Sequence, residues 1–134
     1  MKDIVTFLKE NPVQYLSTVG PDGLPQVRPF QFMLEQDGRL YFCTSTQKEV
    51  YQSLQTHPYC ELCTSSPSFA WIRVAGKAVF CDDPAIKAQI LAQSPLVKSI
   101  YHTADNPIFT LFYLEHGRAM IGDFSGNPPR IFAF

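Results

Sequence analysis

The chain has 134 residues, the length of one domain (1–134), and can bury about two thirds of the surface that its unfolded form exposes. Its formal net charge of −1 gives no electrostatic reason to expect binding to nucleic acid or to an anionic membrane. No apolar run approaches the roughly 20 residues that cross a bilayer, and Met1-Lys2-Asp3 does not open a signal peptide. We therefore expect a soluble cytoplasmic protein.

Hydrophobic periodicity and turn residues divide the chain into short strands joined by a few helices. In chain order the predicted elements are a helix at 3–10, strands at 13–19 and 24–34, a strand at 40–43 followed by a helix from 46 to Pro58, strands at 59–64 and 70–81, a helix at 83–93, a helical turn near 96–101, and strands at 108–114 and 118–124. Turns at 20–23 and 37–38 would join the first three strands into an antiparallel meander.

The stretch from Leu40 to Pro58 combines a strand, a hydroxyl-rich turn and an amphipathic helix. Thr46 and Glu49 have the spacing of a capping box, in which each side chain bonds the other's backbone amide. A helix N-terminus attracts phosphate because its amides are unpaired. The plain alternative is an ordinary helix cap with a solvated Lys48.

Three features of the second half predict packing. Gly76 interrupts the long alternating strand and predicts a bulge or a close backbone approach. The strand Ile108–Leu114 is apolar on both faces, which predicts that it lies between the core and a subunit interface. The tail Ser125–Phe134 ends in four residues too apolar to remain loose in water. Six or seven antiparallel strands with a few helices indicate a mainly β protein, a small closed barrel of Greek-key type.

The four cysteines could suggest redox or zinc chemistry, because Cys60 and Cys63 form a C-x-x-C pattern. In a strand, however, residues three apart point to opposite faces, so the two sulfurs should diverge. No second pair completes a zinc site. We predict that all four cysteines are small buried hydrophobic residues and that the chain holds no metal.

Basic and hydroxyl side chains are predicted to converge on one anion. Arg28 lies on an apolar strand face, where a guanidinium costs stability unless it holds an anion. Thr44, Ser45 and Lys48 follow the next strand of the meander. Together they favour a phosphomonoester site; the alternative is that Arg28 is a rim residue paired with an acidic side chain.

The order of these elements resembles the pyridoxamine 5′-phosphate oxidase-like family of FMN-binding split barrels. The pieces that carry the resemblance are Leu16–Val19 before Pro21–Gly23, then Val27–Phe30, Leu40–Thr44 with Lys48, Leu54 and His57–Pro58, and Val74–Ala78. The resemblance implies a six- to seven-stranded antiparallel split barrel. It also implies a homodimer with FMN at two equivalent sites, each built from both subunits.

Carried over residue by residue, the resemblance implies an FMN site in this chain. Its implied members are the phosphate ligands Arg28, Thr44, Ser45 and Lys48, the backbone of Pro29, Phe30 and Gln31 beside the isoalloxazine edge, Gln47 near the phosphate or ribityl chain, and Trp71 with the strand from Phe109 to Phe112 covering the flavin from the other subunit. Glu49 replaces a second basic residue of the true oxidases, and the segment 127–134 matches their substrate-binding end poorly. Pyridoxamine phosphate is therefore not the expected substrate.

Three function classes remain open. The first is an FMN-dependent oxidoreductase acting on an unidentified small molecule, in which the flavin does the electron chemistry; we name no catalytic side chain. The second is a non-enzymatic flavin protein for storage, electron transfer or sensing. The third is a barrel that has lost its cofactor and serves as an interaction module. The deazaflavin F420 is an alternative cofactor, because these barrels accept either.

Overall fold

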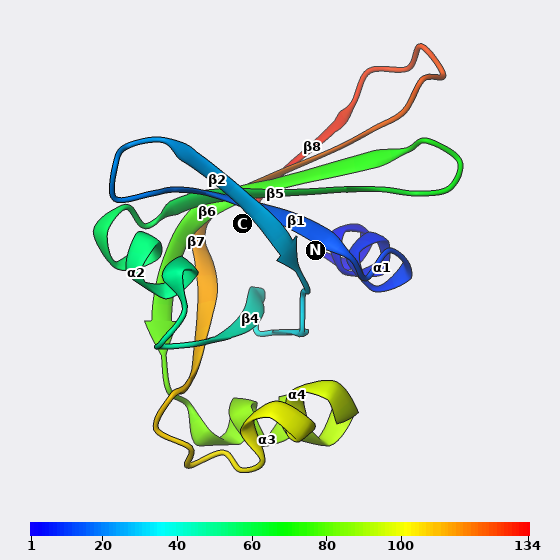
Figure 1. The fold of residues 1–134 in the computed structure, drawn as a ribbon. Helices are drawn as coiled ribbons and strands as arrows, with labels where there is room; N and C mark the ends of the chain where they lie inside the picture. The colour runs from blue at the N-terminus through cyan, green and yellow to red at the C-terminus, as the bar shows by residue number, and fades with distance from the viewer.

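The computed structural model describes residues 1–134, and its centre is one eight-stranded antiparallel sheet that curves into an open barrel (Figure 1). The strands are β1 (Gln14–Val19), β2 (Pro25–Phe30), β3 (Leu34–Gln36), β4 (Arg39–Ser45), β5 (Tyr59–Ser65), β6 (Trp71–Cys81), β7 (Phe109–Gly122) and β8 (Arg130–Ala133). Their order is β2-β1-β5-β6-β7-β4-β3, with β8 paired to β7. The predicted mainly β barrel is confirmed, with eight strands in place of six or seven. The sheet does not close, because β2 and β3 at its two ends do not pair, whereas the sequence predicted a closed barrel.

Four helices cover the sheet: α1 (Lys2–Glu10), α2 (Glu49–Thr56), α3 (Pro84–Gln93) and α4 (Pro95–Tyr101). Helices α1 and α2 add Ile4, Leu8, Val50 and Leu54 to an inner core inside the barrel. Helices α3 and α4 lie together below the barrel in Figure 1 and form an outer core against β4 and β7. None of the helices has the length and apolar character that crossing a membrane requires.

Strand β7 separates the two cores. Phe112 faces inward and stacks on Phe42 with ring centroids 5.2 Å apart. Phe109 and Leu111 face the outer core, which α3 and α4 of the same chain supply. The expectation that a subunit interface covers the second face of this strand is therefore wrong, because helices predicted only as a connection between strands do so instead.

The same strand runs without a break through residues 115–117, where the sequence predicted a turn. The register between β6 and β7 shifts at Gly76, as the bulge prediction required. A Cβ atom on Gly76 would lie 3.0 Å from Cβ of Leu114. The bulge absorbs the irregular Glu115-His116-Gly117 sequence within one long strand. The tail is ordered as predicted, because β8 pairs with the second half of β7.

The predicted strand 24–34 is two strands, β2 and β3, separated by residues 31–33. The buried side chain of Gln14 holds this break. Its oxygen accepts a hydrogen bond of 2.6 Å from the Phe32 amide, and its nitrogen donates to the carbonyls of Leu8 and Asn11. Both predicted hairpins form, because β1 pairs with β2 and β3 pairs with β4. The three-stranded meander is not continuous, however, since β2 and β3 lie at opposite ends of the strand order and β4 also pairs with β7.

The cysteines differ in exposure, contrary to the prediction that all four are buried. Cys60 is buried, Cys43 and Cys81 are half-buried, and Cys63 is exposed. Cys60 and Cys63 lie on opposite faces of β5, as their spacing predicted, and no disulfide forms. No three His, Cys, Asp or Glu side chains gather where they could hold a metal ion.

Replacing Phe112 by alanine should lower the free energy of unfolding by about 3–5 kcal/mol, because the cavity would open at the centre of the inner core. Urea unfolding followed by circular dichroism measures this loss. Phe124→Ala, at a site where the side chain is 84% exposed, is the control and should stay within about 0.5 kcal/mol of the parent. Equal losses for both variants would contradict the two-core description.

Alkaline pH should destabilise the protein through its buried thiols. Burial raises the pKa values of Cys43 and Cys60 from 9.0 to about 12. Above pH 9 the unfolded chain loses protons that the folded chain keeps, so the free energy of unfolding should fall as the pH rises from about 9 toward 12. Urea midpoints between pH 7 and pH 10.5 test this, and a Cys43→Ala/Cys60→Ala variant should lose less stability over that range. An identical slope in both proteins would refute it.

Candidate functional site

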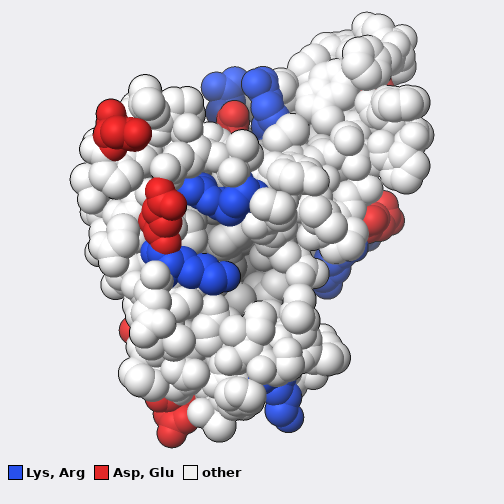
Figure 2. All heavy atoms as spheres, viewed as in Figure 1, with Lys and Arg blue, Asp and Glu red and all other residues white.

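A pocket of about 290 Å³ opens where the end of β2 faces β4 and α4. Figure 2 shows a hollow on this face of the molecule, with basic and acidic atoms gathered along one side of it. The pocket is lined by Pro12, Val13, Pro29, Phe30, Gln31, Met33, Cys43, Lys48, Val97, Ile100 and Tyr101. Lys48 is the one charged residue among them, so the pocket is apolar with a positive end.

Arg28 lies on β2 directly before the residues that line the pocket. Its guanidinium donates to the Leu16 carbonyl (3.2 Å) and to the Thr18 hydroxyl (2.7 Å). The chain has two ion pairs, Lys87–Asp82 and Arg130–Asp3, so neither Arg28 nor Lys48 has a carboxylate partner. The alternative that Arg28 is an ion-paired rim residue is therefore wrong for this chain.

Glu49 is the acidic side chain that acts on the Arg28 charge, and its carboxylate is already hydrogen-bonded to Gln26. The Gln26 amide donates to the Glu49 carboxylate at 2.6 Å and accepts a weaker bond from Arg28 at 3.4 Å. Burial lowers the pKa of the Arg28 guanidinium, an effect that the Glu49 charge opposes. Gln26 thus separates the two charges, which leaves the positive end of the pocket free for an outside anion.

The turn between β4 and α2 supplies hydroxyl groups, but without the predicted capping box. Helix α2 begins at Glu49, its N-cap residue is Lys48, and no side chain caps it. The Thr46 amide instead donates to the Ile108 carbonyl, and the Ser45 hydroxyl accepts from the Gln47 amide at 3.1 Å. Thr46 and Glu49 are thus engaged by Ile108, directly before β7, and by Gln26 of β2, so the capping-box prediction is wrong.

Thr44 carries the most informative hydroxyl of this turn. Its side chain is 2% exposed, and its oxygen has no hydrogen-bond partner within the protein. An unsatisfied buried hydroxyl costs free energy unless a ligand supplies the missing partner. It lies in the last two residues of β4, between the barrel and the first turn of α2.

The structure brings only part of the predicted set to the pocket. Pro29, Phe30, Gln31 and Lys48 line it, and Gln47 is exposed in the adjoining turn. Arg28, Thr44, Ser45 and Trp71 are not among the lining residues. Trp71 packs on Phe124, with ring centroids 5.2 Å apart. The side chains from Phe109 to Phe112 are buried in the cores of their own chain.

Sequence reasoning missed the wall that α4 contributes. Val97, Ile100 and Tyr101 line the pocket from this helix, opposite Pro29 and Phe30. The sequence predicted a helical turn here but no role for it, since the same apolar residues would serve an ordinary core. Exposure is the distinguishing signal: Ile100 is 52% exposed although it belongs to a short helix with an apolar face.

Comparison with known proteins identifies the family. The family model described as pyridoxamine 5′-phosphate oxidase matches residues 1–119. A NimC/NimA family protein from Clostridium acetobutylicum is 30% identical, with a TM-score of 0.91 over 100% of this chain and 92% of that chain. No curated protein matches.

Two more distant structures share the fold. A pyridoxamine 5′-phosphate oxidase-related, FMN-binding protein from Nostoc punctiforme is 22% identical, with a TM-score of 0.74 over 98% of this chain and 87% of that chain. An F420 reductase is 21% identical, with a TM-score of 0.62 over 82% of this chain and 90% of that chain. The resemblance drawn from the sequence motifs is confirmed: the chain belongs to the pyridoxamine 5′-phosphate oxidase family.

Proposed function

We propose that the protein binds FMN in this pocket and acts as an oxidoreductase on a small molecule. Two observations carry the proposal: the basic side chains of Arg28 and Lys48 have no carboxylate partner, and the buried hydroxyl of Thr44, at the end of β4, has no hydrogen-bond partner. The FMN-binding relative from Nostoc punctiforme supports the choice of cofactor.

The residues present fit FMN at both of its ends. A phosphate dianion would gain charge-assisted hydrogen bonds from Arg28 and Lys48, and it would satisfy the buried hydroxyl of Thr44. Ser45 lies beside it at the start of the turn. The remaining lining is largely apolar and suits a flat, uncharged ring system. A ligand with charges along its whole length would bury most of them without a partner.

The chain's own contribution to the reaction is binding and orientation. Bound FMN supplies the electron-transfer chemistry. Arg28 and Lys48 fix the phosphate end, and the backbone from Pro29 to Gln31 limits how far the ring can turn. The apolar lining excludes water from the ring, and we assign no general acid or base.

A homodimer completes the proposed site. Tyr15 and Val27 are 51% and 67% exposed on the outer face of β1 and β2, so a second apolar surface would bury them. Tyr15 pairs with Pro29, which also lines the pocket, so this apolar face runs up to the pocket's edge. A partner seated on it would border the flavin, and Trp71 of that partner is the residue we propose for its cover.

Two alternatives stay open for measurement. The F420 reductase among the structural relatives supports a deazaflavin as the second candidate cofactor. The visible spectrum and the mass of the chromophore released from protein made in its native host distinguish the two. Stopped-flow reduction by NADH or NADPH, followed by reoxidation with candidate acceptors, distinguishes an enzyme from a non-enzymatic flavin protein.

Arg28→Ala and Lys48→Ala should each weaken FMN binding by roughly 10- to 150-fold, since each removes a charge-assisted bond worth about 1.5–3 kcal/mol. Fluorescence titration of the apoprotein with FMN measures the dissociation constants. Lys98→Ala is the matched control, because Lys98 is exposed on α4 and does not line the pocket. Unchanged affinity in both Arg28→Ala and Lys48→Ala would refute the phosphate site.

Val27→Asp should convert the dimer to a monomer, because a carboxylate would be buried in the apolar contact without a partner. Sedimentation velocity measures the assembly, and circular dichroism verifies that the variant is folded. Leu96→Asp, at a side chain that is 66% exposed on α4, is the control and should stay dimeric. A parent protein that sediments as a monomer at micromolar concentration would end the dimer proposal.

A further inference from the structure

Tyr101 lines the pocket with a side chain whose hydroxyl is not engaged by the protein. The residue is 4% exposed and lines the pocket, and its hydroxyl makes no hydrogen bond within the chain. Two buried side-chain atoms lack both a partner and solvent contact, and they belong to Thr44 and Ser53. The Tyr101 oxygen is not one of them, so it keeps a little accessible surface, and the open space that this residue borders is the pocket.

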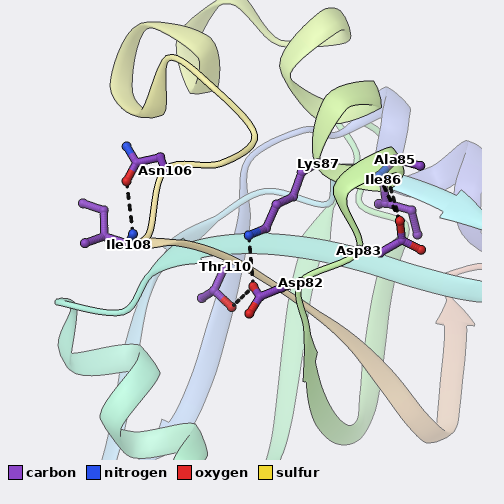
Figure 3. A network of polar contacts seen from close by, with 8 residues as sticks. All are labelled: Asp82, Asp83, Ala85, Ile86, Lys87, Asn106, Ile108 and Thr110. Carbon is purple, nitrogen blue, oxygen red and sulfur yellow. Dashed lines mark hydrogen bonds and ion pairs between the residues drawn. The ribbon is translucent and has the colours of Figure 1, made fainter.

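The ring of Tyr101 is fixed by packing on Phe109. It stacks on Phe109 at 4.5 Å between centroids and 17° between planes. The ammonium group of Lys87 lies over the Phe109 ring, 5.5 Å from the ring centroid. The same nitrogen forms an ion pair with Oδ1 of Asp82 at 3.1 Å. Figure 3 shows Lys87 and Thr110 meeting at the Asp82 carboxylate. The stack therefore rests on the buried Lys87 side chain, whose ammonium group is paired with the exposed Asp82 carboxylate.

The backbone of Tyr101 is fixed as well. Its carbonyl accepts from the Thr103 amide at 2.9 Å and from the Asn106 side chain at 2.8 Å. The first bond closes a turn around His102, whose φ of 70° and ψ of −55° match the strained form of the γ-turn. Strain of this kind persists where the surrounding structure enforces it, and it is common at ligand sites.

The hydroxyl is a neutral donor at physiological pH. Burial raises the pKa of Tyr101 to about 12, with a smaller contribution from Cys43, which also lines the pocket. No charged side chain lines this end of the pocket, because Lys48 is the single charged lining residue. An acceptor on an uncharged ring is the ligand group that suits such a donor.

From the fixed ring, the free hydroxyl and the neutral lining, we propose that Tyr101 donates a hydrogen bond to the isoalloxazine ring and that α4 forms the ring subsite of the pocket. This inference rests on the proposed function, since it takes FMN as the ligand. A planar carbonyl substrate offers the same chemistry, and the test separates the two sources.

The test compares lumiflavin, the uncharged ring without ribityl phosphate, with FMN on the apoprotein. Tyr101→Phe removes the hydroxyl and keeps the stacked ring. The substitution should weaken the binding of lumiflavin and of FMN by the same factor, about 3- to 10-fold. It should also shift the visible absorption of bound lumiflavin. Lys48→Ala should weaken FMN alone. Tyr113→Phe, in the same outer core but away from the pocket, should affect neither ligand.

The outcomes separate the two proposals. Wild-type affinity of Tyr101→Phe for both flavins would overturn the ring subsite and leave FMN binding untouched. The planar ketone 2-acetylnaphthalene is titrated against the FMN-loaded protein. If Tyr101→Phe weakens the binding of this ketone alone, the hydrogen bond from Tyr101 to the flavin is refuted and Tyr101 is assigned to the substrate. A wild-type protein that binds FMN no more tightly than lumiflavin would refute the phosphate site, whatever Tyr101→Phe does to lumiflavin.

Discussion

The structure depends on β7 being buried on both faces. Its inward side chains stack in the barrel, and its outward side chains receive α3 and α4. The same strand pairs with β4, β6 and β8, so the barrel, the helical cover and the C-terminal segment all meet on it. The pocket depends on this arrangement, because β2 and β4 of the barrel form one of its walls and α4 forms the other. Any movement of α4 relative to β2 would change the pocket directly.

The side-chain amide of Gln26 lies between the charged groups of Arg28 and Glu49. Arg28 and Glu49 contact the same side chain, that of Gln26, and could otherwise pair with each other directly. Gln26 prevents this by taking the Glu49 carboxylate, and the arginine is held by a carbonyl and hydroxyl that leave its charge intact. Neutral partners orient a cation without cancelling its attraction for a ligand. Arg28 therefore keeps its positive charge without a carboxylate partner in this chain.

The sequence was informative where a pattern has one physical meaning. Alternation on β6, the glycine bulge and the capped helix at Asp83 are each confirmed, because they depend on neighbours along the chain or on one residue's geometry. It was misleading where contacts are distant. The Thr46–Glu49 capping box failed because Ile108 and Gln26, both far along the chain, compete for the same groups. The pocket wall at Tyr101 could not be read from periodicity, since an apolar helix face looks alike whether it packs on a core or borders a ligand.

The buried carboxamide of Gln14 has a consequence for how this barrel can vary. Between β2 and β3 no backbone ladder continues, and this one side chain bridges the first helix and the loop that carries Phe32. Met33 of the same loop is held separately, because its amide donates to the Tyr41 carbonyl and its carbonyl accepts from the Gln93 side chain. Replacing Gln14 would therefore free the loop from α1 at Phe32 while the bonds at Met33 still tie it to β4 and α3.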